Sequence, residues 1–196
     1  MRGAVTGPDG RYRCPWSLGS EDDLRYHDQE WGRPVRDDTG IFERLCLEAF
    51  QSGLSWLTIL RKRENFRAAF RGFDLAAVAA FGAQDVERLL GDAGIVRNRA
   101  KIEAAINNAR AALELPSGLA AMVWSYAGEQ AVAPQTVDDV PSWTPASKAL
   151  SAALRRHGFR FTGPVTAYAM MQACGIVDDH LAGCFRRSAY LPCKPR

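Results

Sequence analysis

Two pairs of metal-binding side chains lie near opposite ends of the sequence. Cys14 precedes His27 in a C-x12-H pattern, and His180 precedes Cys184 in an H-x3-C pattern. The second spacing puts both side chains on one face of a helical turn. Structural zinc takes four nitrogen or sulfur ligands, so two Cys and two His leave no open position. The sequence predicts a structural zinc ion that joins the two ends of the chain; the alternative is that each pair is incidental.

A carboxylate and three aromatic residues form a second group with chemical potential. Glu48 lies inside the apolar run 45–50, where a charge is costly unless it has a partner or a function. Trp56 follows it, and Trp16 and Tyr26 adjoin the first pair of metal ligands. Flat rings with a hydrogen-bond acceptor suit a pocket for a purine rotated out of a DNA duplex. In the alternative interpretation Glu48 pairs with an arginine, and Trp16 and Trp56 belong to the core.

A glycine-marked turn near the C-terminus suggests contact with a phosphate backbone. Gly158 is expected to adopt a positive φ at a helix end, and Gly163 lets a phosphate approach the backbone closely. The N–H groups at the start of the next helix then form an anion site. Phe159 and Phe161 are expected to pin the turn while Arg160 faces solvent. The pattern favours a helix-hairpin-helix module, although an ordinary turn between helices is the alternative.

The elements that must position these residues are predicted to be helices. Apolar periodicity and capping residues indicate helices over about 39–51, 56–70, 75–81, 85–90, 98–113, 146–156 and 164–173. Asp38 is expected to cap the first of them. Runs with a period of two are lacking, so the fold class is all-α. The segment 132–145, with three prolines, is the one long loop candidate.

Composition sets the limits of these interpretations. The chain has 196 residues, 47% hydrophobic and 24% charged, which fits one folded domain and excludes a disordered tail or a fibre. A net charge of +3 permits an anionic partner without requiring one. The sequence shows neither a secretory signal nor a membrane-spanning run. We therefore expect a monomer in the reducing cytoplasm, where five Cys need not form disulfides.

Several collinear motifs resemble the bacterial DNA-3-methyladenine glycosylase I family. They cover residues from about 11 to 184 and are RCPW (13–16), YHDQEWG (26–32), QSGLSW (51–56), KRENF (62–66), DAGI (92–95), TPAS (144–147) and MQACG (171–175). The resemblance implies a helix-hairpin-helix DNA glycosylase fold in which zinc joins the two ends. It also implies removal of 3-methyladenine from alkylated double-stranded DNA, leaving an abasic site.

The resemblance assigns expected roles to individual residues. Glu48 and Tyr26 would hydrogen-bond the base, and Trp56 and Trp16 would stack on it or wall it. Leu54 would enter the vacated base stack as a wedge. The expected zinc ligands are Cys14, His27, His180 and Cys184, and the expected DNA-binding residues of the hairpin are Gly158, Arg160 and Gly163.

Two positions depart from the family pattern. Asp178 stands where the family often has Asn, so it is a candidate general base or oxocarbenium stabiliser; alternatively it caps a helix and positions His180. Asp23 stands where some members carry an aromatic residue. Pro164 and Val165 follow the hairpin glycine in place of a Schiff-base lysine, so hydrolysis without strand cleavage is expected.

The expected organisation is one glycosylase unit over 11–190 between a disordered extension (1–10) and a tail (191–196). A helical core over about 38–175 would carry a zinc-stapled subdomain built from 11–35 and 176–190. Two other functions remain open at this point. One is a zinc-stapled helix-hairpin-helix module that binds DNA without catalysis, and the other is a glycosylase for a different damaged base.

Overall fold

The computed structural model describes residues 3–128 and 132–187, and this part of the chain is mostly helical, as the sequence predicts. One two-stranded antiparallel sheet is added to the helices. The α-helices are α1 (Glu21–Gln29), α2 (Asp38–Gln51), α3 (Trp56–Ala69), α4 (Leu75–Ala79), α5 (Ala83–Gly91), α6 (Arg99–Leu113), α7 (Leu119–Trp124), α8 (Pro145–Arg156) and α9 (Pro164–Ala173). The strands are β1 (Val5–Thr6) and β2 (Tyr12–Arg13), and the 3-10 helices are η1 (Pro15–Leu18), η2 (Arg71–Phe73) and η3 (Val137–Asp139).

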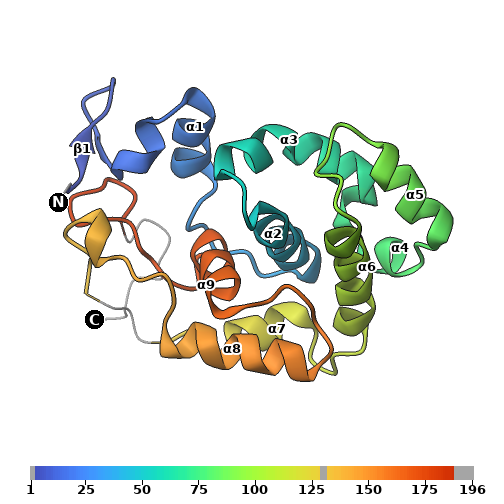
Figure 1. Ribbon diagram of the computed structural model, residues 1–196. Helices are drawn as coiled ribbons and strands as arrows, with labels where there is room; N and C mark the ends of the chain where they lie inside the picture. Colours follow the sequence, from blue (N-terminus) through green and yellow to red (C-terminus); the bar gives the residue numbers. More distant parts are fainter. Residues whose placement is uncertain (1–2, 129–131, 188–196) are drawn as a thin grey trace.

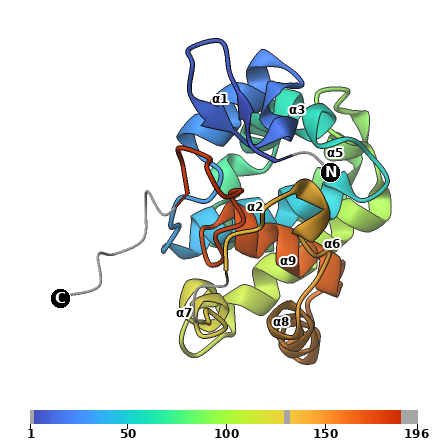
Figure 2. The same ribbon diagram turned by 90° about the vertical axis from the view of Figure 1, so that its left-hand side faces the viewer.

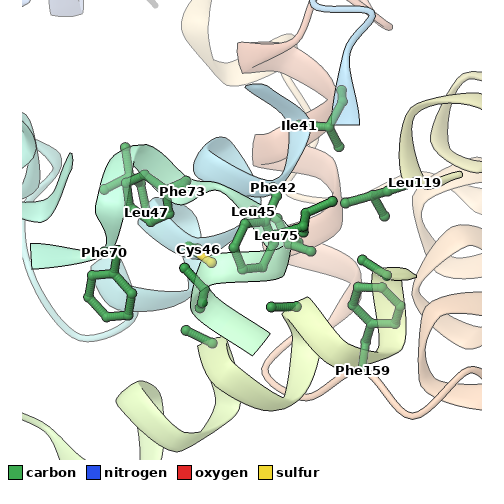
Figure 3. Close-up of a cluster of buried hydrophobic side chains, with 14 of the residues drawn as sticks. Ile41, Phe42, Leu45, Cys46, Leu47, Phe70, Phe73, Leu75, Leu119 and Phe159 are labelled. Atoms are coloured by element: carbon green, nitrogen blue, oxygen red, sulfur yellow. The ribbon is translucent and has the colours of Figure 1, made fainter. Parts of the chain in front are cut away.

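Helix α2 forms the centre of the molecule. It contacts α3, α4, α6, α7 and α9, and Figure 1 shows these helices arranged around it. Phe42, Leu45 and Cys46 of α2 pack with Phe70 and Phe73 in the main core (Figure 3). A helix that is apolar nearly all round is expected to be covered on every side. The consequence for function is that Glu48, on the same helix, lies in the interior.

Side-chain caps fix where the helices begin. The cap of α2 is Asp37, whose Oδ1 accepts a hydrogen bond from the backbone N–H of Gly40 at 2.7 Å. The expectation of Asp38 as this cap is therefore wrong by one residue. The carboxylate of Asp38 accepts a hydrogen bond from the N–H of Ala120, in the first turn of α7, at 2.7 Å. Asp38 thus joins α2 to α7, a long-range contact that α2's own sequence does not reveal.

The N-terminal segment corrects a second expectation. Residues 3–10 are not a disordered extension, because β1 pairs with β2 and Asp9 holds the buried guanidinium of Arg13. The turn between the strands runs through Pro8, Asp9 and Gly10, which are common turn residues. Residues 1–2 and the expected tail 191–196 lie outside the described residues. The proposed division into a core and a zinc-stapled subdomain stays a prediction.

The two ends of the described chain lie side by side. Figures 1 and 2 place the β1–β2 hairpin next to the segment that follows α9. The N–H of Phe185 donates a hydrogen bond to the carbonyl oxygen of Tyr12 at 2.9 Å. A small apolar cluster of Cys14, Leu181 and Cys184 lies apart from the main core. No helix in the described ranges has the length and apolar character needed to cross a membrane.

Candidate active site

A cavity of about 610 Å³ lies between segments from both ends of the chain. Its lining comes from α1, α2, α3 and α9, together with segments around η1, η3 and residue 180. Three carboxylates line it, those of Asp23, Glu48 and Asp179, and no Lys or Arg is among the described lining residues. A concave site with this charge favours a cationic ligand.

Aromatic side chains form the walls of this cavity. The ring centroids of Tyr26 and Trp56 are 5.0 Å apart, and those of Trp16 and Tyr26 are 6.4 Å apart. Trp31 also lines the cavity, and its ring lies edge-on to Trp16 at 5.2 Å. The indole Nε1 of Trp56 is buried and has no acceptor in the described part of the chain. The walls therefore offer stacking surfaces and one N–H donor without a protein partner.

Glu48 is buried in this cavity without the partner that the alternative interpretation required. Its side chain is 7% exposed, and within residues 3–128 and 132–187 it has no ion pair or hydrogen bond. Burial raises the pKa of Glu48 to about 8. The nearby carboxylate that pairs with an arginine is Glu43, which binds Arg67 at 2.7 Å. Glu48 is therefore available to bind a ligand that enters the cavity.

The two aspartates before His180 have different environments. The Oδ1 of Asp178 accepts a hydrogen bond from the backbone N–H of His180 at 3.1 Å, and Asp178 is not among the cavity-lining residues. No helix begins at this point, so Asp178 is not a helix cap; its bond agrees only with the other half of the alternative, the positioning of His180. Asp179 lines the cavity, and its Oδ2 accepts hydrogen bonds from Tyr168 and from Gln172 Nε2 at 2.7 Å.

Asp23 contributes a carboxylate to the wall where an aromatic side chain stands in some family members. It lies one helical turn before Tyr26 on α1, and both side chains line the cavity. Its Oδ2 accepts a hydrogen bond from Ser20 Oγ at 2.8 Å. This contact holds the side chain at the start of α1, so the departure in sequence changes the polarity of the cavity.

The four predicted metal ligands converge, although they come from the two ends of the chain. The ligand atoms of Cys14, His27, His180 and Cys184 all lie within 4.8 Å of one another, and all four residues are buried. Sγ of Cys184 is 3.4 Å from Nε2 of His27 and 3.9 Å from Nδ1 of His180. Tetrahedral zinc would separate sulfur and nitrogen ligands by about 3.6 Å, so the donor set and its spacing fit this ion.

The surroundings of the cluster also suit a metal. Nδ1 of His27 lies 2.8 Å from Oδ1 of Asp28, which turns Nε2 toward the two cysteines. Arg13 binds Asp28 through Nε at 3.0 Å and through a terminal nitrogen at 2.8 Å. A carboxylate that orients a histidine is a common outer contact of zinc sites. The hydrogen bond from Cys14 lowers the pKa of Cys184 and raises that of Cys14.

A turn joins α8 to α9 at the predicted position, and its residues follow the expected pattern with one difference. Gly158 has φ +83°, Arg160 is exposed, and Phe159 is buried, as expected. Phe161 does not pin the turn, because it is 43% exposed and has φ +55°. Gly163 caps α9, and a Cβ there would meet no protein atom within 4 Å. Its missing side chain leaves open space at the start of α9.

Leu54 projects from a second exposed turn. This turn joins α2 to α3, and Gly53 within it has φ +84°. The side chain of Leu54 is 42% exposed. Glu48 on α2 and Trp56 on α3 therefore lie on the two helices that this turn connects.

Sequence reasoning did not single out several cavity residues. Gln51, Leu57, Val140 and Gln172 line the cavity, as does Asp179. The motifs 51–56 and 171–175 contain two of these positions, so closer attention to the motifs could have found them. The two hydrophobic residues gave no signal, because an apolar side chain in a cavity wall looks like any core residue in sequence.

The helical fold combines an acidic, aromatic-walled cavity with a buried Cys2His2 cluster. Comparison with known proteins identifies the family of a chain with this combination. The model of the methyladenine glycosylase family matches residues 16–187, so the chain belongs to this family. It is 48% identical over 177 residues to DNA-3-methyladenine glycosylase 1 of Escherichia coli, covering 88% of this chain and 95% of that protein.

Solved structures show the same relationship. A crystal structure of 3-methyladenine DNA glycosylase I matches with a TM-score of 0.86 and 47% identity, covering 89% of this chain and 99% of that one. A variant of such an enzyme in complex with 3-methyladenine matches with a TM-score of 0.84 and 34% identity, covering 89% of this chain and 97% of that one.

Proposed function

We propose that this protein is a DNA repair glycosylase that flips out and hydrolyses 3-methyladenine from alkylated double-stranded DNA. It acts as a monomer in the bacterial cytoplasm and leaves an abasic site without cutting the strand. The observation that carries the proposal is Glu48, a buried carboxylate without a protein donor in a cavity walled by Tyr26 and Trp56. A relative of the same family has been solved with 3-methyladenine bound.

The charge of the substrate explains how such a cavity accelerates the reaction. Methylation at N3 makes the base cationic, so the glycosidic bond is already weak. When it breaks, its electron pair moves to N9 of the base and neutralises the cation. The sugar carbon is left as an oxocarbenium ion; water adds to it and releases a proton to solvent. The positive charge thus passes from the base to the sugar, and the protein's task is to extrude the cationic base and hold it in place while its weakened bond breaks.

Individual residues divide this task. The positive charge of the base favours the ionised form of Glu48, whose carboxylate then attracts the cation and accepts a charge-assisted hydrogen bond from its amino group. Trp56 and Trp16 stack on the base or wall it, and each cation–π contact contributes about 0.5–2 kcal/mol. The hydroxyl of Tyr26 provides a further hydrogen bond to the base. Asp178 acts through the backbone of His180, so it is a positioning residue in this proposal.

The metal cluster serves the structure of the site. Cys14, His27, His180 and Cys184 would hold a zinc ion with no open coordination position, so the ion supplies folding energy to the two joined ends. Trp16 follows Cys14 closely and Tyr26 precedes His27, so the same residues fix two cavity walls. The chain thereby builds the cavity from segments that are distant in sequence.

Two exposed turns would contact the duplex. The hairpin around Gly158, Arg160 and Gly163 presents N–H groups at the start of α9 to a phosphate, as in helix-hairpin-helix proteins. Leu54 would fill the space that the extruded base leaves. Open space at Gly163 and the exposure of Leu54 support these roles.

Product analysis with the zinc-loaded protein tests the proposal. Methylated duplex DNA is incubated with the protein, the released bases are identified by chromatography, and the strands are examined for abasic sites and nicks. The expected result is free 3-methyladenine with intact strands containing abasic sites. Release of another base would indicate a different lesion, and DNA binding without release would indicate a non-catalytic binding module. Either result overturns the proposal.

A further inference from the structure

Helix α6 carries a buried lysine that bonds to the end of α2. Nζ of Lys101 donates hydrogen bonds to the carbonyl oxygens of Phe50 at 2.9 Å and Ser52 at 2.6 Å. These carbonyls belong to the last turn of α2 and to the turn that presents Leu54. Lys101 is 8% exposed, so this contact is made inside the protein.

The same helix holds the hairpin between α8 and α9. Nδ2 of Asn108 donates to the carbonyl oxygen of Arg160 at 2.9 Å, and its Oδ1 accepts from the N–H of Arg160 at 2.7 Å. Nδ2 of Asn107 donates to the carbonyl oxygen of Gly158 at 2.7 Å. Asn108 is 1% exposed. The two bonds to Arg160 fix the backbone of this hairpin residue through both its N–H and its C=O.

Lys101 balances a cost against a gain. A buried ammonium is costly, and its two acceptors in the described part of the chain are neutral carbonyls. Burial lowers the pKa of Lys101 accordingly. An apolar side chain of similar length would avoid this desolvation cost but would remove the donor from the carbonyl oxygens of Phe50 and Ser52, so the lysine fixes these two backbone groups. The end of a helix, with its exposed carbonyls, is a favourable place for a cation.

We propose that Lys101 and Asn108 are positioning residues that set the Leu54 turn and the hairpin at a fixed separation for one DNA duplex. They are seven residues apart on α6, which places them on the same side of the helix and about 10 Å apart along its axis. The inference rests on the proposed function, because it assumes that both turns contact DNA. Neither residue lines the cavity.

Because the two residues hold different turns, changing each one should affect a different step: duplex binding for Asn108 and base extrusion for Lys101. A general loss of structure would affect both steps together. Changing Asn108 displaces the hairpin whose N–H groups contact a phosphate, so it should weaken binding of the duplex. Changing Lys101 releases the Leu54 turn and should slow base extrusion once the duplex is bound. Binding of free 3-methyladenine in the cavity should change less than duplex binding or extrusion, since no residue of α6 lines the cavity.

The experiment compares Asn108→Leu, Lys101→Met and Lys101→Arg with wild type. Glu103→Gln is the matched control, because Glu103 is exposed on the same helix. Duplex affinity is measured with DNA that carries a stable abasic analogue, and free-base affinity by fluorescence of the cavity tryptophans. Base extrusion is followed with 2-aminopurine, and excision under single-turnover conditions with saturating DNA.

The loss of one or two hydrogen bonds should change an affinity or a rate constant by about tenfold. Asn108→Leu should weaken duplex binding by this factor, and Lys101→Met should slow extrusion and excision by this factor, with partial rescue by Lys101→Arg. Equal losses of free-base and duplex binding, or no change in either variant, would overturn the inference. If Asn108→Leu does not fold, Asn107→Ala, which removes the bond to the carbonyl oxygen of Gly158 at a less buried position, replaces it. Should wild type excise nothing, the proposed function fails, while duplex affinity and extrusion still decide this inference.

Discussion

The burial of Glu48 should make the empty protein less stable than a variant without this carboxylate. Glu48 has a pKa of about 8 in the folded protein and about 4.5 in an unfolded chain. Below pH 4.5 Glu48 is protonated in both the folded and the unfolded state, so its titration does not lower the free energy of unfolding. Between pH 4.5 and 8 only the folded state holds the proton, so stability falls as the pH rises. Above pH 8 neither state holds it, and the cost becomes constant.

The pKa difference gives the size of this effect. Each pH unit contributes about 1.4 kcal/mol, so the cost is about 3 kcal/mol at pH 7 and about 5 kcal/mol above pH 8. The variant Glu48→Gln keeps the shape of the protonated acid and removes its titration. Its free energy of unfolding should therefore equal that of wild type near pH 4.5 and exceed it increasingly up to pH 8.

Urea unfolding of zinc-loaded protein at pH 5, 7 and 8.5 measures this difference. Taking the variant minus wild type at each pH cancels the titration of other groups, and Glu64→Gln serves as the control because Glu64 is 76% exposed. A difference that stays constant with pH, or a variant less stable than wild type, would refute the reasoning. Either result would mean that Glu48 already has an internal partner or that water reaches it.

Four other perturbations follow from the site. Cys184→Ser should lower bound zinc in elemental analysis and lower the melting temperature; unchanged zinc content would remove Cys184 from the ligands. Asp28→Asn should weaken zinc binding about 10- to 100-fold in chelator competition, and equal affinity would show that Asp28 does not orient His27. Leu54→Ala should change stability by less than about 0.5 kcal/mol while slowing excision from duplex DNA, and an unchanged rate would count against the wedge. Trp56→Ala should weaken free 3-methyladenine binding roughly 5- to 150-fold by loss of base stacking, whereas equal affinity would show that Trp56 does not contact the base.

Most helices could be predicted from the sequence because their ends carry local signals. Asn98 caps α6, and Gly158 ends α8 with the expected positive φ. Helices α1 and α7 were missed. The first is rich in charged residues, and the second is only six residues long, so neither shows a clear apolar period. Their stability comes from tertiary contacts, such as the bond from Asp38 to the start of α7.

The site was predictable where chemistry restricts the residue type. Cys and His are rare in this chain, so their pairs identified the cluster whose four side chains the structure brings together. The choice between Asp178 and Asp179 was not open to sequence reasoning, because adjacent residues differ only in the direction that the backbone gives them. The exposure of Phe161 was missed for the same reason, since its positive φ turns it away from Phe159.

The most direct test of the account is the single-turnover release of 3-methyladenine from methylated duplex DNA by wild type and by Glu48→Gln. Both proteins are folded and zinc-loaded, and Glu64→Gln is the control. A hydrogen bond to a charged group contributes about 1.5–3 kcal/mol, so the variant should be slower by roughly 10- to 150-fold, with the control unchanged. Equal rates for wild type and Glu48→Gln would contradict the central claim that this carboxylate recognises the damaged base.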